Sequence, residues 1–227
     1  MCIRDRSSGT TSPVITNSIF YHNTATQNGG AVKNDGIDGT TTPTIVNTTF
    51  YGNTATDGGA IENEGSGAIP TIFNTILWNN SGDEILNNTG ATATLNHSII
   101  DDGNPDNNVT LPSGTTGDNN LDLDPVLSNA DGDDEIGGTA DDDYHVQGCS
   151  PALNSGTATG APSTDFEGDP RPTGSGHDIG FDESLILCEL TVTKKMIGVP
   201  TPATTGIPGN YDAVFQYTIC NLSLIHI

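Results

Sequence analysis

Short apolar runs recur in the same order along the first half of the chain, separated by residues rich in Asn, Gly and Thr. Three segments align with one another, residues 13–32, 43–61 and 70–85, and residues 93–100 give a shorter fourth version. None of them shows the i, i+3, i+4, i+7 apolar spacing of a helix. A period of about 20 to 50 residues is typical of stacked units that bury their apolar faces only against one another.

Each repeat contains short runs of strand-forming residues, which are residues 14–15, 19–21 and 31–32 in the first repeat. Three short strands separated by turns predict one coil of a right-handed parallel β-helix. Successive coils of such a fold lie about 4.8 Å apart, so that equivalent side chains form columns. One interior column is predicted to contain Ile15, Ile45 and Ile72, and a second one Phe20, Phe50, Leu77 and Ile99.

An asparagine recurs between the first two runs of each repeat, and two interpretations of it are open. Stacked Asn side chains can form a ladder of amide–amide hydrogen bonds along the axis. Alternatively, each Asn adopts the left-handed backbone conformation of a turn. The residues concerned are Asn17, Asn47, Asn74 and Asn96, and a second recurring set is Asn23, Asn53 and Asn80.

Two motifs follow each other twice in the same order. Phe-x-x-Asn stands at residues 20–23 and 50–53, and Gly-Gly-Ala-Val/Ile stands at residues 29–32 and 58–61. The glycine pairs predict a tight corner with positive φ, where a small alanine fits the interior. The ordered pair of motifs resembles the FxxN and GGA(I/L/V) repeats of polymorphic outer-membrane proteins. The resemblance covers residues 13–101, although Leu77 replaces the Phe of the third repeat, and it implies a β-helical surface protein.

Residues 123–183 resemble the end region of bacterial surface β-helix proteins that is labelled a choice-of-anchor domain. Asn154 replaces an Asp that is usual there. We predict that residues 123–185 form an irregular acidic cap over the unpaired edges at the end of the coil stack. Arg171 is expected to pair with a carboxylate of this region. The matching residues are Asp124, Pro125, Ser150, Pro151, Ala152, Asp165, Gly168, Arg171, Pro172, Asp178, Ile179 and Gly180.

The composition changes again near residue 186. Residues 186–222 alternate apolar and polar positions and resemble the opening strands of a bacterial Ig-like repeat, with too few strands for the complete sandwich. Cys188 and Cys220 flank this piece and are candidates for a disulfide, although the sequence does not determine the connectivity. Residues 1–6 and 223–227 differ in composition from their neighbours and resemble translated adapter tails. We therefore interpret them as non-native ends of a fragment.

Charge excludes several classes of function. The 227 residues include 29 acidic and 6 basic ones, a net charge of -23. Such a surface repels nucleic acid and disfavours binding to anionic membranes. No apolar run reaches the roughly 20 residues that a membrane-spanning helix needs. An apolar content of 33% is too low for an ordinary globular core but sufficient for the narrow interior of a β-helix.

The acidic residues are concentrated between residues 101 and 183, which hold 19 of the 29 acids and one base. Alternating oxygen ligands around Gly132 resemble the first part of a calcium loop. The segment is not an EF-hand, because Ala140 stands where the twelfth-position Glu would be. The alternative is a solvated acidic surface. The candidate Ca²⁺ ligands are Asn129, Asp131, Asp133, Asp134, Glu135, Asp141 and Asp143.

Catalysis is the rival interpretation, since parallel β-helices include polysaccharide lyases and glycoside hydrolases. A lyase needs a Lys or Arg base, and residues 7–170 contain only Lys33. A hydrolase needs two facing carboxylates. The best candidates are Asp101 and Asp102 near His97, followed by Asp83 and Glu84. Because acidic loops are abundant here, the sequence favours a non-catalytic protein.

The sequence thus predicts an all-β chain with β-helix coils at residues 7–122, an acidic cap at 123–185 and an incomplete Ig-like segment at 186–222. We expect a monomeric extracellular or cell-surface protein of the cell envelope or outer membrane. Its role would be structural or adhesive, with glycans or host and cell-surface proteins as partners. The alternatives are a fragment of a carbohydrate-active enzyme whose active coils are missing, and an inert spacer.

Overall fold

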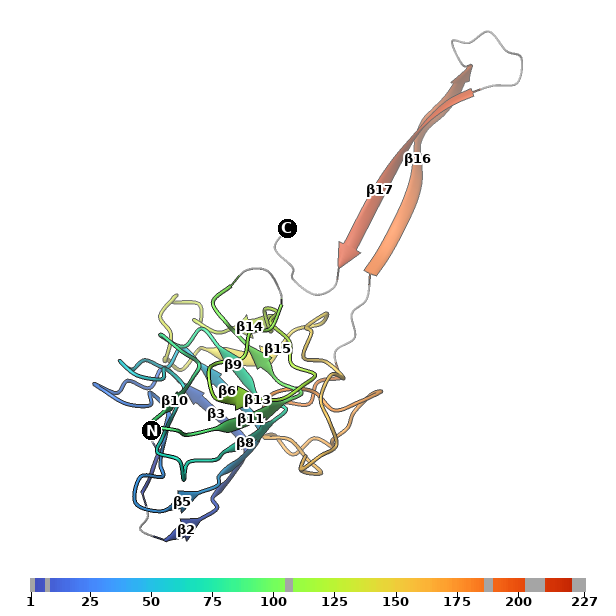
Figure 1. The fold of residues 1–227 in the computed structure, drawn as a ribbon. Coiled ribbons are helices and arrows are strands. Elements are labelled where there is room, and N and C mark those ends of the chain that lie inside the picture. The colour runs from blue at the N-terminus through green and yellow to red at the C-terminus, as the bar shows by residue number, and fades with distance from the viewer. Residues whose placement is uncertain (1–2, 7–8, 105–107, 186–189, 203–210, 222–227) are drawn as a thin grey trace.

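Parallel strands dominate the structure, a computed structural model that describes residues 3–6, 9–104, 108–185, 190–202 and 211–221. The described residues form strands and turns and contain no helix, and accordingly none that could span a membrane. The strands of the first half stack in parallel as a β-solenoid of about three turns (Figure 1). This confirms the predicted all-β solenoid of parallel coils.

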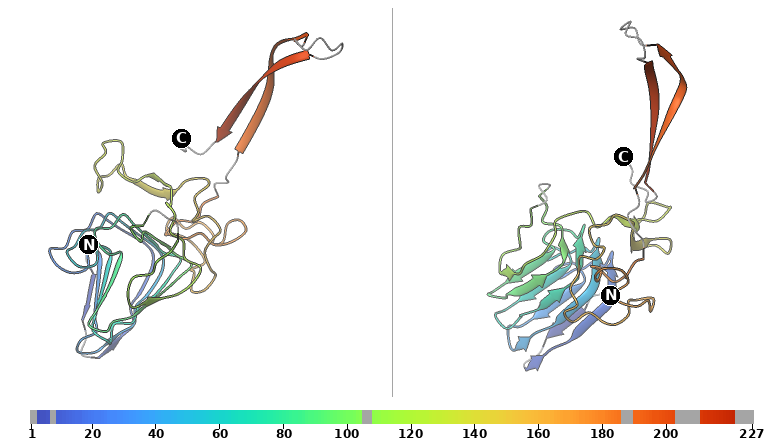
Figure 2. Two further views of the ribbon diagram at one scale, coloured as in Figure 1. Left: turned by 45° about the horizontal axis from the view of Figure 1, so that its top comes forward. Right: turned by 90° about the vertical axis from the view of Figure 1, so that its right-hand side faces the viewer.

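Each coil contributes strands to the same sheets as the coils before and after it (Figure 2). β1 (Ile3–Arg6) pairs with β4 (Val32–Asp35) at one edge, and only the backbone of β1 is described. The coils contain β2 (Thr10–Thr11), β3 (Val14–Tyr21), β4 (Val32–Asp35), β5 (Thr40–Thr41), β6 (Thr44–Tyr51), β7 (Ile61–Glu64), β8 (Thr71–Phe73), β9 (Ile76–Trp78), β10 (Ile85–Asn88), β11 (Ala93–Asn96), β12 (Ile99–Ile100) and β13 (Thr115–Thr116).

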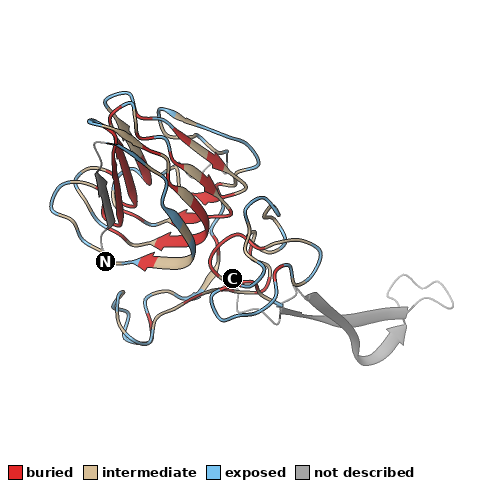
Figure 3. Ribbon diagram, turned by 90° about the horizontal axis from the view of Figure 1, so that it is seen from below, coloured by how far each residue is buried: buried red, intermediate tan, exposed pale blue. Residues whose placement is uncertain are grey.

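The interior columns were largely predicted. Phe20 pairs with Phe50 in register, their rings stack with centroids 4.9 Å apart, and Phe50 pairs in turn with Leu77. Ile15, Ile45 and Ile72 are also partners in successive coils. Figure 3 shows buried residues gathered along the facing strands of the coils. Apolar side chains therefore fill a narrow shaft rather than a globular core.

The predicted register of the fourth coil was wrong by one residue. Ile100 pairs with Leu77 and belongs to the interior cluster, whereas Ile99 pairs with Ile76 and faces outward. Side chains alternate between the two faces of a strand, so that a one-residue shift moves each of them to the other face. The same shift places His97, and not Asn96, at the kink that Asn74 occupies in the third coil.

The recurring kink explains the first asparagine set. Asn17, Asn47, Asn74 and His97 all have positive φ, between 45° and 48°, a conformation that Asn adopts more easily than most residues. One amide–amide bond joins Asn74 to Asn47, at 3.3 Å. The turn interpretation is therefore confirmed for this set, and the ladder interpretation holds only for the bond between Asn47 and Asn74.

Continuous ladders occur at two other positions. Asn23 donates to Asn53, and Asn53 to Asn80, each at 2.8 Å. Asn34, Asn63 and Asn87 form a second ladder with bonds of 2.7 and 2.8 Å. Stacking identical amides pairs each buried donor with an acceptor in the next coil.

The glycine pairs form the predicted corner. Gly29 and Gly58 have φ of 54° and 65°. A Cβ on Gly30 would lie 2.0 Å from the carbonyl oxygen of Gly59, so only glycine allows the coils to approach this closely.

Residues 123–185, called the flank region below, lie along the side of the coils and not over the end of the stack (Figures 2 and 3). The prediction of an end cap is therefore wrong. The kink asparagines donate to its backbone, Asn17 to Thr164, Asn47 to Asp178 and Asn74 to Thr157. The flank region thus spans three coils.

An outward-facing apolar surface explains this position. Ile76 and Ile99 point away from the shaft and pack with Val146, Ala152 and Ile179 of the flank region in a second core cluster. Burying this surface stabilises the docked arrangement by roughly 25 cal/mol per Å² of apolar area.

The last described strands are β14 (Leu127–Asn129) and β15 (Asp143–Val146), and β16 (Leu190–Pro202) and β17 (Tyr211–Asn221), which form two antiparallel pairs. Two strands do not define an Ig-like sandwich, so that assignment stays a prediction. Cys149 is disulfide-bonded. Cys188, the side chain of Cys220 and residues 223–227 lie outside the described residues.

Candidate functional site

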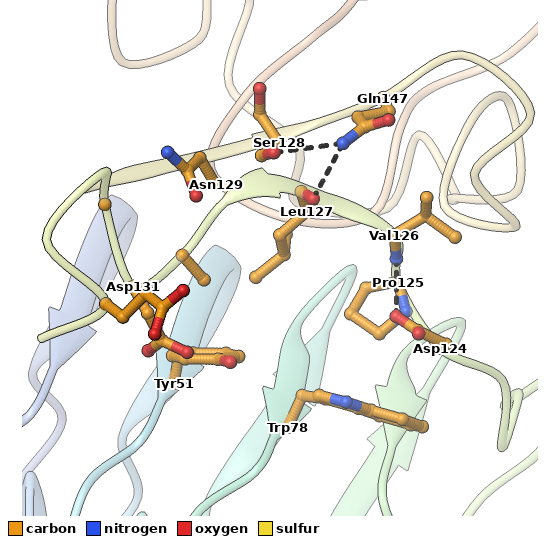
Figure 4. A pocket seen from close by; sticks show the side chains of 13 residues that line it. Tyr51, Trp78, Asp124, Pro125, Val126, Leu127, Ser128, Asn129, Asp131 and Gln147 are labelled. Atoms are coloured by element: carbon orange, nitrogen blue, oxygen red, sulfur yellow. Dashed lines mark hydrogen bonds between the residues drawn. The ribbon is translucent and has the colours of Figure 1, made fainter. Parts of the chain in front are cut away.

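A cleft lies between the outward face of the coils and the start of the flank region (Figure 4). Its volume is about 810 Å³. Tyr51 at the end of β6 and Trp78 at the end of β9 are register partners in neighbouring coils. Their inward neighbours Phe50 and Leu77 fill the shaft, so strand alternation directs both aromatic rings outward into the cleft.

Polar groups line the opposite side of this cleft. Asp124 accepts a hydrogen bond from the Val126 amide, and Gln147 donates to the carbonyl groups of Leu127 and Ser128. These bonds fix the backbone of the segment that faces the two rings. Figure 4 shows the Asp131 carboxylate beside Tyr51, and Asp131 is exposed to solvent. The cleft therefore combines an aromatic floor with hydrogen-bond acceptors.

One ring of the aromatic floor, Tyr51, packs against a tyrosine of the flank region. Tyr144 of β15 lies 4.8 Å from Tyr21 and 5.6 Å from Tyr51, measured between ring centroids. The Tyr144 hydroxyl donates to Asp142 at 2.8 Å. The Tyr51 hydroxyl is neutral at physiological pH, and partial burial raises its pKa further. A rigid, neutral ring is suited to stacking against a ligand.

The acidic loop, residues 129–143, joins β14 to β15 and contains all the predicted Ca²⁺ ligands. Its carboxylates accept hydrogen bonds mainly from the loop itself. Asp141 accepts from the amides of Asp133 and Asp134 and from the Thr139 hydroxyl. These bonds lower the pKa of Asp141. The Asp141 carboxylate is thus already hydrogen-bonded by groups of the acidic loop itself.

The structure brings only part of the predicted calcium set together. Asn129 donates to Asp133 at 3.3 Å, and Asp131 lies 4.0 Å from His22 Nε2. Glu135 occupies a turn with φ of 57°. Asp143 points away from the loop and contacts His145. Calcium binding by the acidic loop therefore stays a prediction.

The carboxylates considered for hydrolysis do share a pocket. Asp83, Glu84, Asp101 and Asp102 line a space of about 470 Å³, and His97 is not among its lining residues. Asp101 accepts from the Gly103 amide, and Asp102 from the amides of Asn104 and Thr110. The two carboxylates therefore stabilise the backbone conformation of the loop that carries them.

Glu84 terminates the asparagine ladder in this pocket. It accepts hydrogen bonds from the backbone and the side chain of Asn80 and is 3% exposed. Burial raises the pKa of Glu84 to about 8, against 4.5 for the unperturbed group. A raised folded-state pKa stabilises the fold at low pH, and that contribution is lost as pH rises from about 4.5 to 8.

We expect Glu84→Gln to flatten the pH dependence of stability in this interval. One titrating group changes the free energy of unfolding by at most about 1.4 kcal/mol per pH unit. Urea unfolding of the full chain between pH 5 and 8 measures the slope. Asp133→Asn, which removes an exposed acidic group, serves as the control and should keep the wild-type slope. Equal slopes for Glu84→Gln and wild type would contradict the assignment.

Lys33, the base considered for a lyase, is ion-paired. Its Nζ lies 3.2 Å from Glu62 and 2.6 Å from Glu64, and the residue is 6% exposed. Although burial by itself lowers the pKa of Lys33, its hydrogen bonds to the two glutamates give a net increase. A general base needs the opposite shift, toward neutral pH.

Arg171 forms the predicted ion pair, with Glu183 at 2.8 Å, and both side chains are fully buried. The carboxylates near this ion pair accept hydrogen bonds from backbone amides of the same region. Asp165 accepts from the amides of Gly168, Asp169 and Glu183, and Asp178 accepts from those of Asn154 and Ser184. This buried polar network orders a region that has little regular secondary structure.

The aromatic cleft was not predicted from the sequence. Tyr21, Tyr51 and Trp78 follow the inward-facing residue in three successive repeats. This outward row was a usable signal, because aromatic side chains repeated on a solvent-facing column are unexpected for a structural shaft.

One family model matches the chain. Residues 47–64 match the Chlamydia polymorphic membrane protein (Chlamydia_PMP) repeat. The matched stretch runs from the kink of β6 through the Phe50 and Asn53 motif and the glycine corner to the end of β7. No curated protein and no solved structure matches significantly. The second coil is therefore similar to a repeat of polymorphic membrane proteins, which supports a surface or outer-membrane association.

Proposed function

We propose that the protein is a non-catalytic, surface-displayed β-helix that binds glycans in the cleft above Tyr51 and Trp78. The observation that carries this proposal is the pair of aromatic rings from neighbouring coils on the floor of a cleft of about 810 Å³. Aromatic floors with a few fixed polar groups are typical of small-molecule sites. The apolar face of a sugar packs on such a ring while its hydroxyls donate to carboxylates.

Charge narrows the class of glycan. The chain carries a net charge of -23, and Asp124 and Asp131 stand at the cleft itself. Uronic-acid polymers such as pectin or alginate would be repelled by these carboxylates. We therefore expect neutral glycans to bind in preference to acidic ones.

Two observations support a non-catalytic role. The pocket carboxylates Asp101 and Asp102 accept backbone hydrogen bonds of their own loop. Lys33 is buried between two glutamates. The second candidate, a glycoside hydrolase, is favoured only by the shared pocket of Glu84 and Asp101. Measurable release of reducing ends from neutral or acidic polysaccharides, abolished by Asp101→Asn, would favour that alternative.

Replacing Trp78 by alanine should weaken binding to the preferred neutral polysaccharide at least about tenfold, because the stacking surface is lost. A glycan array with the full chain identifies the ligand, and calorimetry measures the affinity. Phe166→Ala is the matched control, since Phe166 is a 59% exposed aromatic residue outside the cleft. Unchanged affinity in Trp78→Ala, or an equal loss in Phe166→Ala, would contradict the cleft as the binding site.

A further inference from the structure

Three side chains of types that bind metal ions converge in the flank region. They are His145 in β15, Glu167 and Asp182, and one ligand atom from each lies within 4.8 Å of the others. Among the described residues, these three form the group of His, Cys, Asp and Glu side chains that lie close enough together to hold a metal ion. His145 Nε2 is 3.1 Å from Glu167 Oε1.

The His145 ring is held from both sides. Its Nδ1 lies 2.5 Å from Asp143 Oδ1, and its centroid lies 5.3 Å from that of the Phe181 ring. A carboxylate on one ring nitrogen is the arrangement that orients the other nitrogen of a metal-binding histidine. Asp143, predicted as a direct Ca²⁺ ligand, is placed instead to support His145.

The two carboxylates have capacity for another partner. Glu167 contacts His145, and no hydrogen bond among the described residues uses the half-buried Asp182 carboxylate. His145, Glu167 and Asp182 line one cavity of about 670 Å³. That cavity leaves room for a water molecule or an external ligand as a further coordinating group.

The local charge also favours a cation. Asp143, Glu167 and Asp182 surround a single imidazole, and the arginine of the flank region, Arg171, is paired with Glu183 in a buried ion pair. Three carboxylates beside one imidazole leave the cluster negative even when the ring is protonated. A divalent ion bound there would convert this repulsion into coordination.

We propose that His145, Glu167 and Asp182 bind a divalent transition-metal ion of the zinc class, with Asp143 as the positioning residue of His145. An imidazole ligand favours such ions over Ca²⁺ and Mg²⁺. Zinc–ligand bonds of about 2.0–2.1 Å in tetrahedral geometry place neighbouring ligand atoms about 3.3 Å apart. The His145–Glu167 distance of 3.1 Å already fits this value, and the Asp182 ligand atom lies within 4.8 Å of both. The ion would join three segments of the flank region.

Titration of the full chain with Zn²⁺ tests this site. We expect one high-affinity ion per chain by calorimetry, and a higher melting temperature with Zn²⁺ than with equal Mg²⁺. His145→Ala, Glu167→Gln and Asp182→Asn should each weaken Zn²⁺ binding by about 100-fold or more. Asp143→Asn should weaken it by about 10- to 100-fold. Melting of each variant without metal shows whether it folds.

Asp133→Asn is the control, because it removes one negative charge from the acidic loop, and it should bind Zn²⁺ like wild type. A comparable loss in Asp133→Asn would place the ion in the acidic loop and overturn the proposal. Wild-type affinity in folded Glu167→Gln and Asp182→Asn would overturn it as well. So would Ca²⁺ that displaces Zn²⁺ at equal concentration, since this result would indicate an all-oxygen site.

Discussion

Phe50→Ala is expected to lower the free energy of unfolding by about 3–5 kcal/mol, the cost of emptying a large site in a close-packed core. Phe50 is fully buried, stacks on Phe20 with ring centroids 4.9 Å apart and pairs with Leu77 in the next coil. The cavity would therefore interrupt the shaft at its middle. Chemical denaturation of the full chain measures the change.

Two comparisons make this test specific. Phe50→Leu keeps most of the volume, as Leu77 does at the same position one coil later, and should cost much less. Phe166→Ala removes an aromatic ring that is 59% exposed and should change the unfolding midpoint little. An unchanged midpoint in Phe50→Ala would refute the assignment of Phe50 to the centre of the core.

Arg171→Met is expected to destabilise the flank region by about 3–5 kcal/mol, because removing one partner of a buried pair leaves an uncompensated charge. Arg171 donates to Glu183 at 2.8 Å and to the Gly180 carbonyl at 3.1 Å. Glu183 would keep its bonds from the amides of Thr173 and Asp178 but lose its counter-charge.

The double variant Arg171→Met with Glu183→Gln separates charge from packing. It should recover part of the stability lost in Arg171→Met, since residue 183 then no longer carries an unpaired charge, and a double-mutant cycle gives the coupling energy. Hydrogen exchange should locate the loss in residues 123–185 and leave the coil amides protected. A coupling energy near zero would show that the pair contributes no net interaction.

Much of the coil architecture could be predicted because it is encoded locally and repeatedly. Each coil has the same alternation of inward and outward residues, and the glycine pair 29–30 recurs at 58–59. Phe20 and Phe50 are therefore equivalent in sequence before they are partners in space. Ile99 was assigned wrongly because the fourth repeat is short, and a short repeat leaves the register open by one residue.

The candidate sites were harder to predict, for a related reason. Trp78 and Asp131 meet across a cleft formed by chain segments that share no repeat, and the same is true of His145 and Asp182. The acidic loop was conspicuous in the sequence. Its composition, however, did not indicate that Asp141 would accept backbone amides of its own loop and that Asp143 would turn to His145.

The sequence by itself determined the β-solenoid, its repeat length and the interior positions of Phe20, Phe50 and Leu77. Equivalent residues stack whenever the same pattern of apolar and polar residues recurs in each coil. It also identified Arg171 as a base that would pair with a carboxylate. Only the tertiary structure decided where residues 123–185 dock, because that contact joins Asn47 to Asp178 across more than a hundred residues without any periodic signal. The outward-facing side chains of Ile76 and Ile99 are buried by residues of the flank region, which folds back over the coils. The repeat pattern of the coils contains no information about which later segment does this.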